Sequence, residues 1–289
     1  MTIPGRNMTA ARIALLTTLA MIAFAANSLL CRVALRDTAI DAVTFTTVRM
    51  IAGALTLWLI VGLRSGKADV SGSWYSALAL FAYAIAFSLA YRSLSAAAGA
   101  LLLFGAVQAT MIGYGLWAGE RLRGRQWIGL VLALAGLAGL MLPGLSAPPL
   151  SGALLMIVAG MSWGVYSLRG KGSGDPVGAT AGNFLRTVPI ALALSLALLG
   201  DARWDQAGFW YAAASGTVAS GIGYAIWFAA LPGLKAASAA TVQLSVPVIA
   251  AIGGILFLGE SLTLRLVLAS ATILGGIALV ILRQQPQKT

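Results

Sequence analysis

The sequence contains no histidine and only one cysteine, Cys31. Without histidine there is no imidazole for acid–base catalysis or metal binding, and a serine–histidine intramembrane protease is excluded. A single cysteine excludes an internal disulfide and a cysteine-based metal cluster. Cys31 lies among apolar residues, which favours a role as a small packing side chain.

Charge is also scarce, since only 9% of the 289 residues are charged and 60% are hydrophobic. A soluble domain carries about 25% charged residues, so this chain has too little polar material to cover a soluble surface. The apolar runs are long and uniform and do not alternate as outer-membrane strands do. The composition therefore predicts an all-α membrane protein.

Acidic residues are the rarest charged type, 8 against 19 basic ones, and none lies inside an apolar run. An intramembrane aspartyl protease, which needs two buried aspartates, is therefore disfavoured, and no proton relay is evident. Glycine-rich phosphate-binding motifs are missing, so ATP is not expected to drive the protein. We expect no enzymatic activity, no cofactor and no metal.

The charges divide the chain into windows of about 20 mostly apolar residues, the length of a membrane-spanning helix. Residues 126–168 carry no charge, but Pro143-Gly144 and Pro148-Pro149 mark a loop that divides them. The Ala-Phe-Ala sequence at 23–25 resembles a signal-peptidase site, although we expect the first span to be retained. Ten spans are predicted: 13–31, 42–63, 70–91, 93–119, 126–142, 150–168, 176–200, 206–234, 236–259 and 266–282.

The net charge of +11 would indicate nucleic acid for a soluble protein, but here the basic residues lie between apolar runs. We therefore expect no nucleic-acid partner and use the charges to orient the chain. With the N-terminus inside, the cytoplasmic segments hold Arg6, Arg12, Arg64, Lys67, Arg121, Arg123, Arg125, Arg169, Lys171, Lys235, Arg283 and Lys288. The opposite side holds only Arg32, Arg36, Arg92, Arg203 and Arg265, so both termini are predicted to be cytoplasmic.

One pattern, G-E-x-L-x-x-R, occurs twice, at Gly119–Arg125 and again at Gly259–Arg265. An internal repeat of this kind fixes the architecture. Each half has five spans, and because five is odd, the second half crosses the membrane in the opposite sense. The sequence thus predicts ten transmembrane helices as two inverted five-helix repeats, residues 1–145 and 146–289, an arrangement typical of secondary transporters. Glu120 and Glu260 precede helices, where a carboxylate complements the helix dipole.

The layout and the repeated G-E-x-L loop resemble the drug/metabolite transporter superfamily, EamA type, over nearly the whole chain. Phe24-Ala25-Ala26-Asn27 followed by Arg32 looks like that family's W-G-x-N…K pattern, with phenylalanine where tryptophan is usual. The second half keeps Trp163-Gly164. Within the family, the chain looks most like the YddG amino-acid exporters of bacterial inner membranes. The resemblance implies export of amino acids, aromatic ones among them, through a cavity lined by helices of both halves.

Small multidrug-resistance pumps of the same superfamily use a membrane-embedded glutamate to exchange protons for cations. This chain has no such residue, which disfavours proton-coupled efflux of lipophilic cations. We expect the substrate to move down its own concentration gradient, or its transport to be only weakly coupled to protons.

A transporter must replace the hydration of its substrate with a few placed polar groups near the membrane midplane. Amides and hydroxyls can bind an α-carboxylate or α-amine, and aromatic faces can stack on a ring or attract an ammonium. Core packing, interhelical hydrogen bonds and the interfacial aromatic belt are the alternative roles. The candidate substrate-binding residues are Asn27, with Ser28 beside it, Tyr83, Gln108, Trp163, Tyr166, Tyr224, Trp227, Gln243 and Ser245.

Pro189 and Pro247 lie within spans, where proline removes a backbone hydrogen bond and forms either a gating hinge or a static kink. Arg49 and Arg186 are charges inside spans, and we expect a structural or gating role or binding of an anionic substrate group. Arg49 could reach the interface along its stem, so Arg186 is expected to be the deeper of the two. Small residues spaced by four, as at Ala135/Gly139 and Ala271/Gly275, indicate close helix packing.

Together these features predict an inner-membrane secondary transporter that exports aromatic and other neutral amino acids by alternating access. Its partners are the amino-acid substrate and the lipid bilayer, and a monomer is favoured. One alternative is a carrier of sugar phosphates or other anionic metabolites that uses Arg49 and Arg186. Another is a membrane assembly protein without transport activity.

Overall fold

The computed structural model describes residues 9–65, 70–119, 121–144, 147–170, 174–234 and 236–281. Within them, ten helical segments are long and apolar enough to cross a membrane, and no strand occurs, which confirms the predicted all-α membrane class. The first half comprises α1 (Ala10–Asp37), α2 (Ala42–Ser65), α3 (Trp74–Tyr91), α4 (Ala96–Trp117) and α5 (Gly124–Met141). The second half begins with α6 (Leu150–Gly170) and α7 (Pro176–Ala197), followed by the short η1 (Leu199–Asp201).

The last three spans include two that are not regular α-helices. The eighth is composed of α8 (Gln206–Ala214), the π-helical segment η2 (Ser215–Ile222), α9 (Gly223–Ala230) and η3 (Leu231–Gly233). The ninth is divided into α10 (Ala236–Gln243) and α11 (Ser245–Leu258), and the tenth is α12 (Leu264–Ile281). The sequence predicted the place of each span and a hinge or kink at Pro247 in the ninth, but not the π-helical segment in the eighth.

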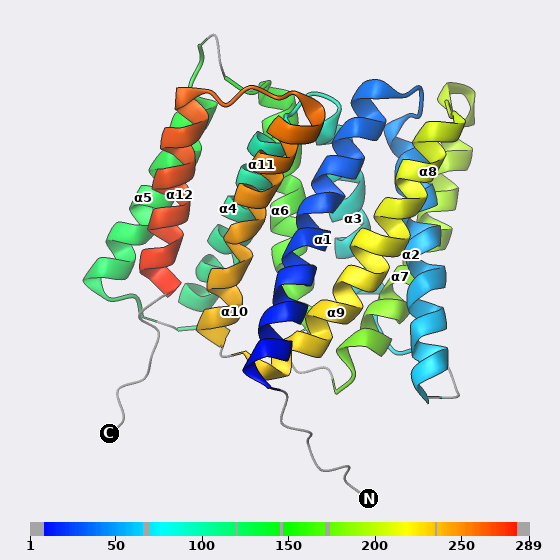
Figure 1. Ribbon diagram of the computed structural model, residues 1–289, viewed down its shortest axis with the longest axis horizontal. Coiled ribbons are helices and arrows are strands. Elements are labelled where there is room, and N and C mark those ends of the chain that lie inside the picture. The colour runs from blue at the N-terminus through cyan, green and yellow to red at the C-terminus, as the bar shows by residue number, and fades with distance from the viewer. Residues whose placement is uncertain are drawn as a thin grey trace, which may run out of the picture.

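Both described chain ends lie at one end of the bundle, which we call the termini end (Figure 1). The opposite end, called the Arg32 end, carries the α1–α2, α3–α4 and α11–α12 connections (Figure 1). Helix α1 starts at the termini end, whereas α6 starts at the Arg32 end. The two halves therefore cross in opposite senses, as the odd number of spans requires.

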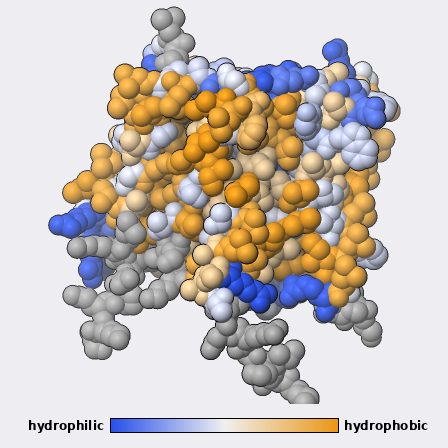
Figure 2. Space-filling model, in the orientation of Figure 1, coloured by the Kyte–Doolittle hydropathy of each residue, from blue (hydrophilic) through white to orange (hydrophobic). Residues whose placement is uncertain are grey.

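The outer surface is apolar around the middle of the bundle. Figure 2 shows hydrophobic residues across the visible face, with hydrophilic residues gathered towards its two ends. Four tryptophans near span ends are exposed, as an interfacial belt requires: Trp74, Trp117, Trp204 and Trp210. This surface suits a lipid bilayer as solvent.

Capping side chains define several helix starts, and Asp41 does so for α2. Its carboxylate accepts hydrogen bonds from the backbone N–H groups of Val43, Thr44 and Arg203 and from the Thr44 hydroxyl. Partial burial raises the pKa of the Asp41 carboxyl, but these hydrogen bonds together lower it more, so that its net pKa lies below the ordinary value. The cap also ties the α1–α2 turn to the segment before α8.

Helices α5 and α12 pack closely at one side of the bundle (Figure 1). A Cβ added to Gly276 would lie 2.5 Å from the Gly129 carbonyl oxygen, and one added to Gly129 would lie 2.5 Å from the Gly276 carbonyl oxygen. In contrast, an added Cβ at Gly139 or Gly275 meets nothing within 4 Å. The expectation that Gly139 and Gly275 mark the close contact is therefore wrong, because these two glycines face away from it.

Leucine at Gly276 is expected to separate α5 from α12 and to lower the midpoint of thermal unfolding. Overpacking a close contact costs about 1–3 kcal/mol, and here backbone atoms are the obstacle. Thermal unfolding in detergent measures the effect. Gly275→Leu is the matched control, since it adds the same side chain one position away in open space. Equal unfolding midpoints for the two variants would contradict the packing described.

Candidate functional site

A cavity of about 680 Å³ lies inside the bundle and is lined by residues of both halves. It runs from the middle of the bundle to the termini end, where the exposed residues Ser71, Gly174 and Asp175 belong to its wall. Its deeper wall comes from α1, α3, α4, α6, η2, α9 and α10. The fold thus forms a chamber that is open towards one end of the bundle.

Eight of the nine candidate substrate-binding residues line this cavity. They are Asn27, Tyr83, Gln108, Trp163, Tyr166, Tyr224, Trp227 and Gln243, and Ser28 joins them. Ser245 does not line it, because its hydroxyl donates to the backbone oxygen of Val242 at 2.6 Å at the start of α11.

Trp163 lies at the centre of an aromatic cluster that forms one wall. Its ring stacks on Tyr224 with centroids 5.3 Å apart and an interplanar angle of 24°. The ring centroids of Tyr83 and Tyr166 lie 4.9 and 5.3 Å from that of Trp163. Such a wall offers ring faces for stacking and for attracting a cation.

A polar network borders the aromatic wall. The hydroxyl of Tyr83 accepts hydrogen bonds from Asn27 Nδ2 at 3.3 Å and from Arg49 Nη2 at 3.1 Å. Asn27 Oδ1 in turn accepts a hydrogen bond from the Ser215 hydroxyl at 2.6 Å. The network joins α1, α2, α3 and η2, and two of its members, Asn27 and Tyr83, line the cavity.

Gln108 on α4 and Gln243 on α10 bring a carboxamide from each half to the cavity. The helix of the ninth span is interrupted at Leu244, immediately after Gln243 and three residues before the buried Pro247. A proline lacks the N–H that would bond to the carbonyl four residues earlier and collides with that carbonyl, so Pro247 explains the break. Pro189, by comparison, is exposed and lies within a continuous α7. Whether either proline acts as a hinge stays a prediction.

The two arginines within spans differ in a way that the sequence did not reveal. Arg49 is completely buried. Arg186 donates from Nη1 to the backbone oxygens of Ser71 and Gly182, at 2.9 and 2.8 Å, and does not line the cavity. Arg186 was expected to lie deeper along its span, and it does occupy the middle of α7, but its side chain turns back towards the α2–α3 connection, whereas that of Arg49 is buried within the bundle.

Several lining residues were not among the candidates. Phe24 packs edge-on against Tyr224 and Trp227, and Phe87 contacts Tyr83. The polar residues missed are Ser71, Ser73, Ser76, Ser167, Arg169, Asp175, Thr180 and Asn183. Most of these lie near the termini end, where a polar residue at a span end carries no special signal in the sequence. Asn183, which is buried within its span, could have been found by the criterion that selected Asn27.

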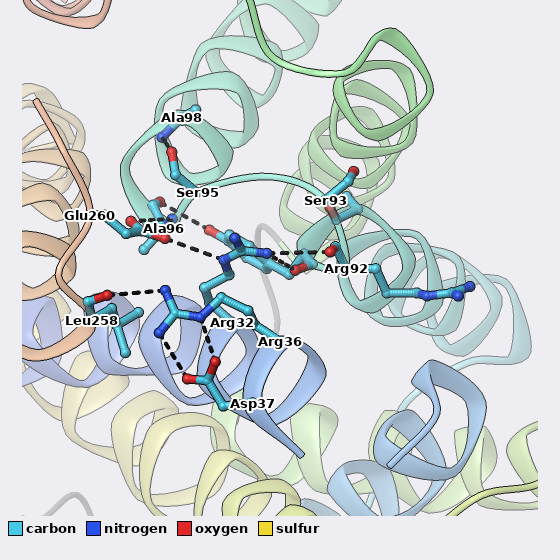
Figure 3. A network of polar contacts seen from close by, with 12 residues as sticks. Arg32, Arg36, Asp37, Arg92, Ser93, Ser95, Ala96, Ala98, Leu258 and Glu260 are labelled. Atoms are coloured by element: carbon cyan, nitrogen blue, oxygen red, sulfur yellow. Dashed lines mark hydrogen bonds and ion pairs between the residues drawn. The ribbon is translucent and has the colours of Figure 1, made fainter. Parts of the chain in front are cut away.

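The Arg32 end is closed by a group of contacts that Figure 3 shows. Arg32 Nε pairs with Glu260 Oε1 at 3.2 Å, and Arg32 Nη1 donates to the backbone oxygen of Tyr91 at 2.9 Å. The Glu260 carboxylate also accepts the backbone N–H of Ala96 at the start of α4, at 2.9 and 3.1 Å. We call Arg32, Glu260 and the Ala96 N–H the Arg32 latch. It joins α1, α4 and the α11–α12 connection.

The carboxylate of Glu260 thus caps α4 rather than the helix that follows it in sequence. Glu120, its repeat partner, lies outside the described residues. The Arg32 and Glu260 side chains are only 13% and 10% exposed. Removing one partner of a pair so shielded from water costs more than it does at a surface salt bridge, because the remaining charge is left uncompensated.

Comparison with known proteins identifies the family. The model of the EamA-like transporter family matches residues 11–142 and again residues 150–282. The chain belongs to the EamA-like transporter family. The protein is therefore a multi-pass membrane transporter of the drug/metabolite type, and members of this family are transporters rather than enzymes.

Three individual relatives and one solved structure agree with this family. An uncharacterized protein of Pseudomonas aeruginosa is 57% identical over 93% of this chain and 94% of its own length. The threonine/homoserine exporter RhtA of Salmonella typhimurium is 31% identical over 56% of this chain and 57% of its own, and the uncharacterized transporter YoaV of Bacillus subtilis is 26% identical over 55% and 57%. A crystal structure with 18% identity superposes with a TM-score of 0.67 over 93% of this chain and 97% of its own, which supports the fold alone.

Proposed function

We propose that this transporter exports amino acids, aromatic and other neutral ones, across a bacterial inner membrane by alternating access. The observation that carries this proposal is the chemistry of the cavity. Its deep wall is formed by aromatic and aliphatic side chains together with a few carboxamides and hydroxyls. Its charged lining residues among those described, Arg169 and Asp175, belong to the α6–α7 region near the termini end. A volume of about 680 Å³ is within the usual range for small-molecule sites.

A zwitterionic amino acid suits this wall. The Trp163 and Tyr224 faces can attract an ammonium or stack on an aromatic side chain. Carboxamides such as Gln108 and Gln243 can donate or accept hydrogen bonds. The wide apolar space accepts side chains of different sizes, which favours broad specificity.

The orientation that the basic residues indicate is compatible with export. If the termini end is cytoplasmic, the cavity is open to the cytoplasm and the Arg32 latch closes the external side. This is the state that would load a cytoplasmic substrate. Release then requires the latch to open and the termini end to close, as expected for two inverted repeats around a central site.

The exporter RhtA supports the choice of substrate class, since its name gives threonine and homoserine as cargo and it matches about half of this chain. A carrier of sugar phosphates is less well supported, because Arg186 does not line the cavity and its guanidinium is already bound to two backbone carbonyls, of Ser71 and Gly182. A doubly charged phosphate would find Arg169 as the cationic lining residue among those described. An assembly protein without transport activity does not account for the open chamber.

Counterflow in proteoliposomes tests the proposal. Vesicles are preloaded with unlabelled phenylalanine, threonine or a sugar phosphate, and entry of labelled phenylalanine is followed. We expect phenylalanine and threonine, but not the sugar phosphate, to stimulate entry at least several-fold over protein-free vesicles. Absence of stimulation by any amino acid, with protein shown to be folded, would remove the substrate assignment and leave the family membership.

A further inference from the structure

Arg49 is the largest side chain that is fully buried in the described structure. Its Nη2 donates to the Tyr83 hydroxyl at 3.1 Å, and its Nε donates weakly to the Ser220 hydroxyl at 3.4 Å. Nη1 is buried and has no hydrogen-bond partner. A guanidinium has five N–H donors and normally finds acceptors for most of them when buried.

No acidic side chain of the described residues lies within ion-pair distance of Arg49. Two aromatic faces lie near its charge instead, with Cζ 5.3 Å from the ring centre of Tyr83 and 5.1 Å from that of Phe87. Cation–π attraction offsets only part of the cost of removing an arginine from water. The centre of the bundle therefore holds a positive charge that this conformation leaves without an anion.

This charge lies directly behind the cavity wall. Arg49 itself does not line the cavity, but Tyr83, to which it donates, does. Asn27 lines the cavity as well and donates to the same hydroxyl. A buried charge acts strongly across so short a distance, because little water screens it.

The π-helical segment η2 supplies hydrogen-bond partners to both Asn27 and Arg49. Ser215 and Ser220, both within η2, bind Asn27 and Arg49 respectively. Short π-helical insertions are rare and frequently occur at functional sites. Here the insertion places two hydroxyls of one helix on the same network.

We propose that Arg49, Tyr83 and Asn27 form a carboxylate subsite, in which the carboxylate of the substrate supplies the missing anion. This inference rests on the proposed function and deepens it, because it assigns the residues that recognise the carboxylate of the substrate. The carboxylate lies against the wall at Tyr83 and Asn27, and Arg49 acts through them as a positioning residue. Amines and alcohols of the same shape leave the guanidinium uncompensated and bind poorly.

Binding to the purified full-length protein in nanodiscs tests the subsite. The probes are L-phenylalanine and L-phenylalaninol, which keeps the ring and the amine but has a hydroxymethyl group in place of the carboxylate. We expect the wild type to prefer the acid about tenfold or more, the usual value of one charge-assisted interaction. Arg49→Gln should reduce the preference to within about twofold, and Arg49→Lys, which keeps the charge, should restore part of it.

Arg186→Gln is the matched control, because Arg186 is also an arginine within a span but does not line the cavity, and its guanidinium binds the backbone oxygens of Ser71 and Gly182. It should keep the full preference for the acid. Should Arg49→Gln fail to fold, Asn27→Asp serves instead. It is nearly isosteric and places a carboxylate of the protein beside Tyr83, so it should abolish the preference while unfolding at the same temperature as the wild type or a higher one.

The outcomes separate the two proposals. A wild type that binds neither probe would remove the proposed substrate class and this inference with it. A wild type that prefers the acid, with the same preference in Arg49→Gln and in Asn27→Asp, would overturn the carboxylate subsite alone. A general loss of affinity for both probes in Arg49→Gln, with the ratio unchanged, would also overturn it, because that is the effect of a purely structural arginine.

Discussion

Replacing Glu260 with glutamine is expected to open the Arg32 end of the transporter. The substitution removes the anion that pairs with Arg32 and weakens the cap on the Ala96 N–H. Removing one partner of a shielded ion pair costs about 3 kcal/mol or more, because the other charge is left uncompensated. The cost falls only on the conformation in which the latch is closed. The equilibrium between the two states should then shift by about a hundredfold towards the one open at the Arg32 end.

Cysteine labelling from that side measures the shift. The native Cys31 is buried and is replaced by alanine, and Ser28, which lines the cavity, becomes the only cysteine. A membrane-impermeant maleimide added on the side of the Arg32 end should label Ser28→Cys slowly when the latch is intact. In the Glu260→Gln background, labelling from this side should be at least tenfold faster, and labelling from the termini end should slow.

Arg92 provides the control. It lies at the same end and has the same charge as Arg32, but its side chain points away from the latch (Figure 3). Arg92→Gln should leave both labelling rates unchanged. Exchanging the charges, Arg32→Glu with Glu260→Arg, should slow the labelling again. A Glu260→Gln variant that labels like the wild type from both sides would show that the latch does not hold this end closed.

The latch illustrates what the sequence could and could not predict. Long apolar windows and the charges between them were enough to place all ten spans, because hydrophobic length is a local property. Helix α1 was predicted at 13–31 but continues to Asp37, since Arg32 and Arg36 find partners on the α11–α12 side and need not end the helix. The repeated G-E-x-L motif singled out Glu260, but not the helix that its carboxylate caps, because contacts between α4 and α11 depend on tertiary packing.

Within the site, the depth of a residue along its span was a good guide to the cavity. Polar and aromatic residues near mid-span converge there, because an unpaired amide or hydroxyl facing lipid is costly. The sequence could not predict the direction in which a side chain points. Arg49 and Arg186 occupy similar places in the two halves, yet one is fully buried and the other turns towards a loop. The π-helical segment η2 was also missed, since no proline marks it, whereas Pro247 had indicated a hinge or kink near the break at Leu244.

Replacing Trp163 with alanine is expected to remove most transport of aromatic amino acids. Trp163 contacts Tyr83, Tyr166 and Tyr224, so its loss opens the aromatic wall as well as removing a stacking face. An aromatic pair contributes about 0.5–1.5 kcal/mol beyond its buried area. Together with the lost contact area of an indole, this should raise the phenylalanine concentration for half-maximal counterflow by at least tenfold.

The size of the effect should depend on the substrate. Threonine has no ring to stack on Trp163, so the same variant should raise its half-maximal concentration by only a few-fold. Trp163→Phe keeps a ring and should lie between the wild type and Trp163→Ala for phenylalanine. Trp210→Ala is the matched control, because it removes an indole that is 62% exposed and contacts Phe209 rather than the cavity.

A selective loss would identify Trp163 as a specificity residue, since a general defect in folding or in the conformational cycle lowers transport of both substrates alike. Equal losses for phenylalanine and threonine in Trp163→Ala, with Trp210→Ala unaffected, would mean that the indole supports the cavity wall without recognising the substrate ring. Unchanged transport of both would mean that the substrate binds elsewhere in the cavity, towards Gln108 and Gln243. Recognition of aromatic substrates would then rest on the other rings that line the cavity, of which Trp227 has the largest side chain.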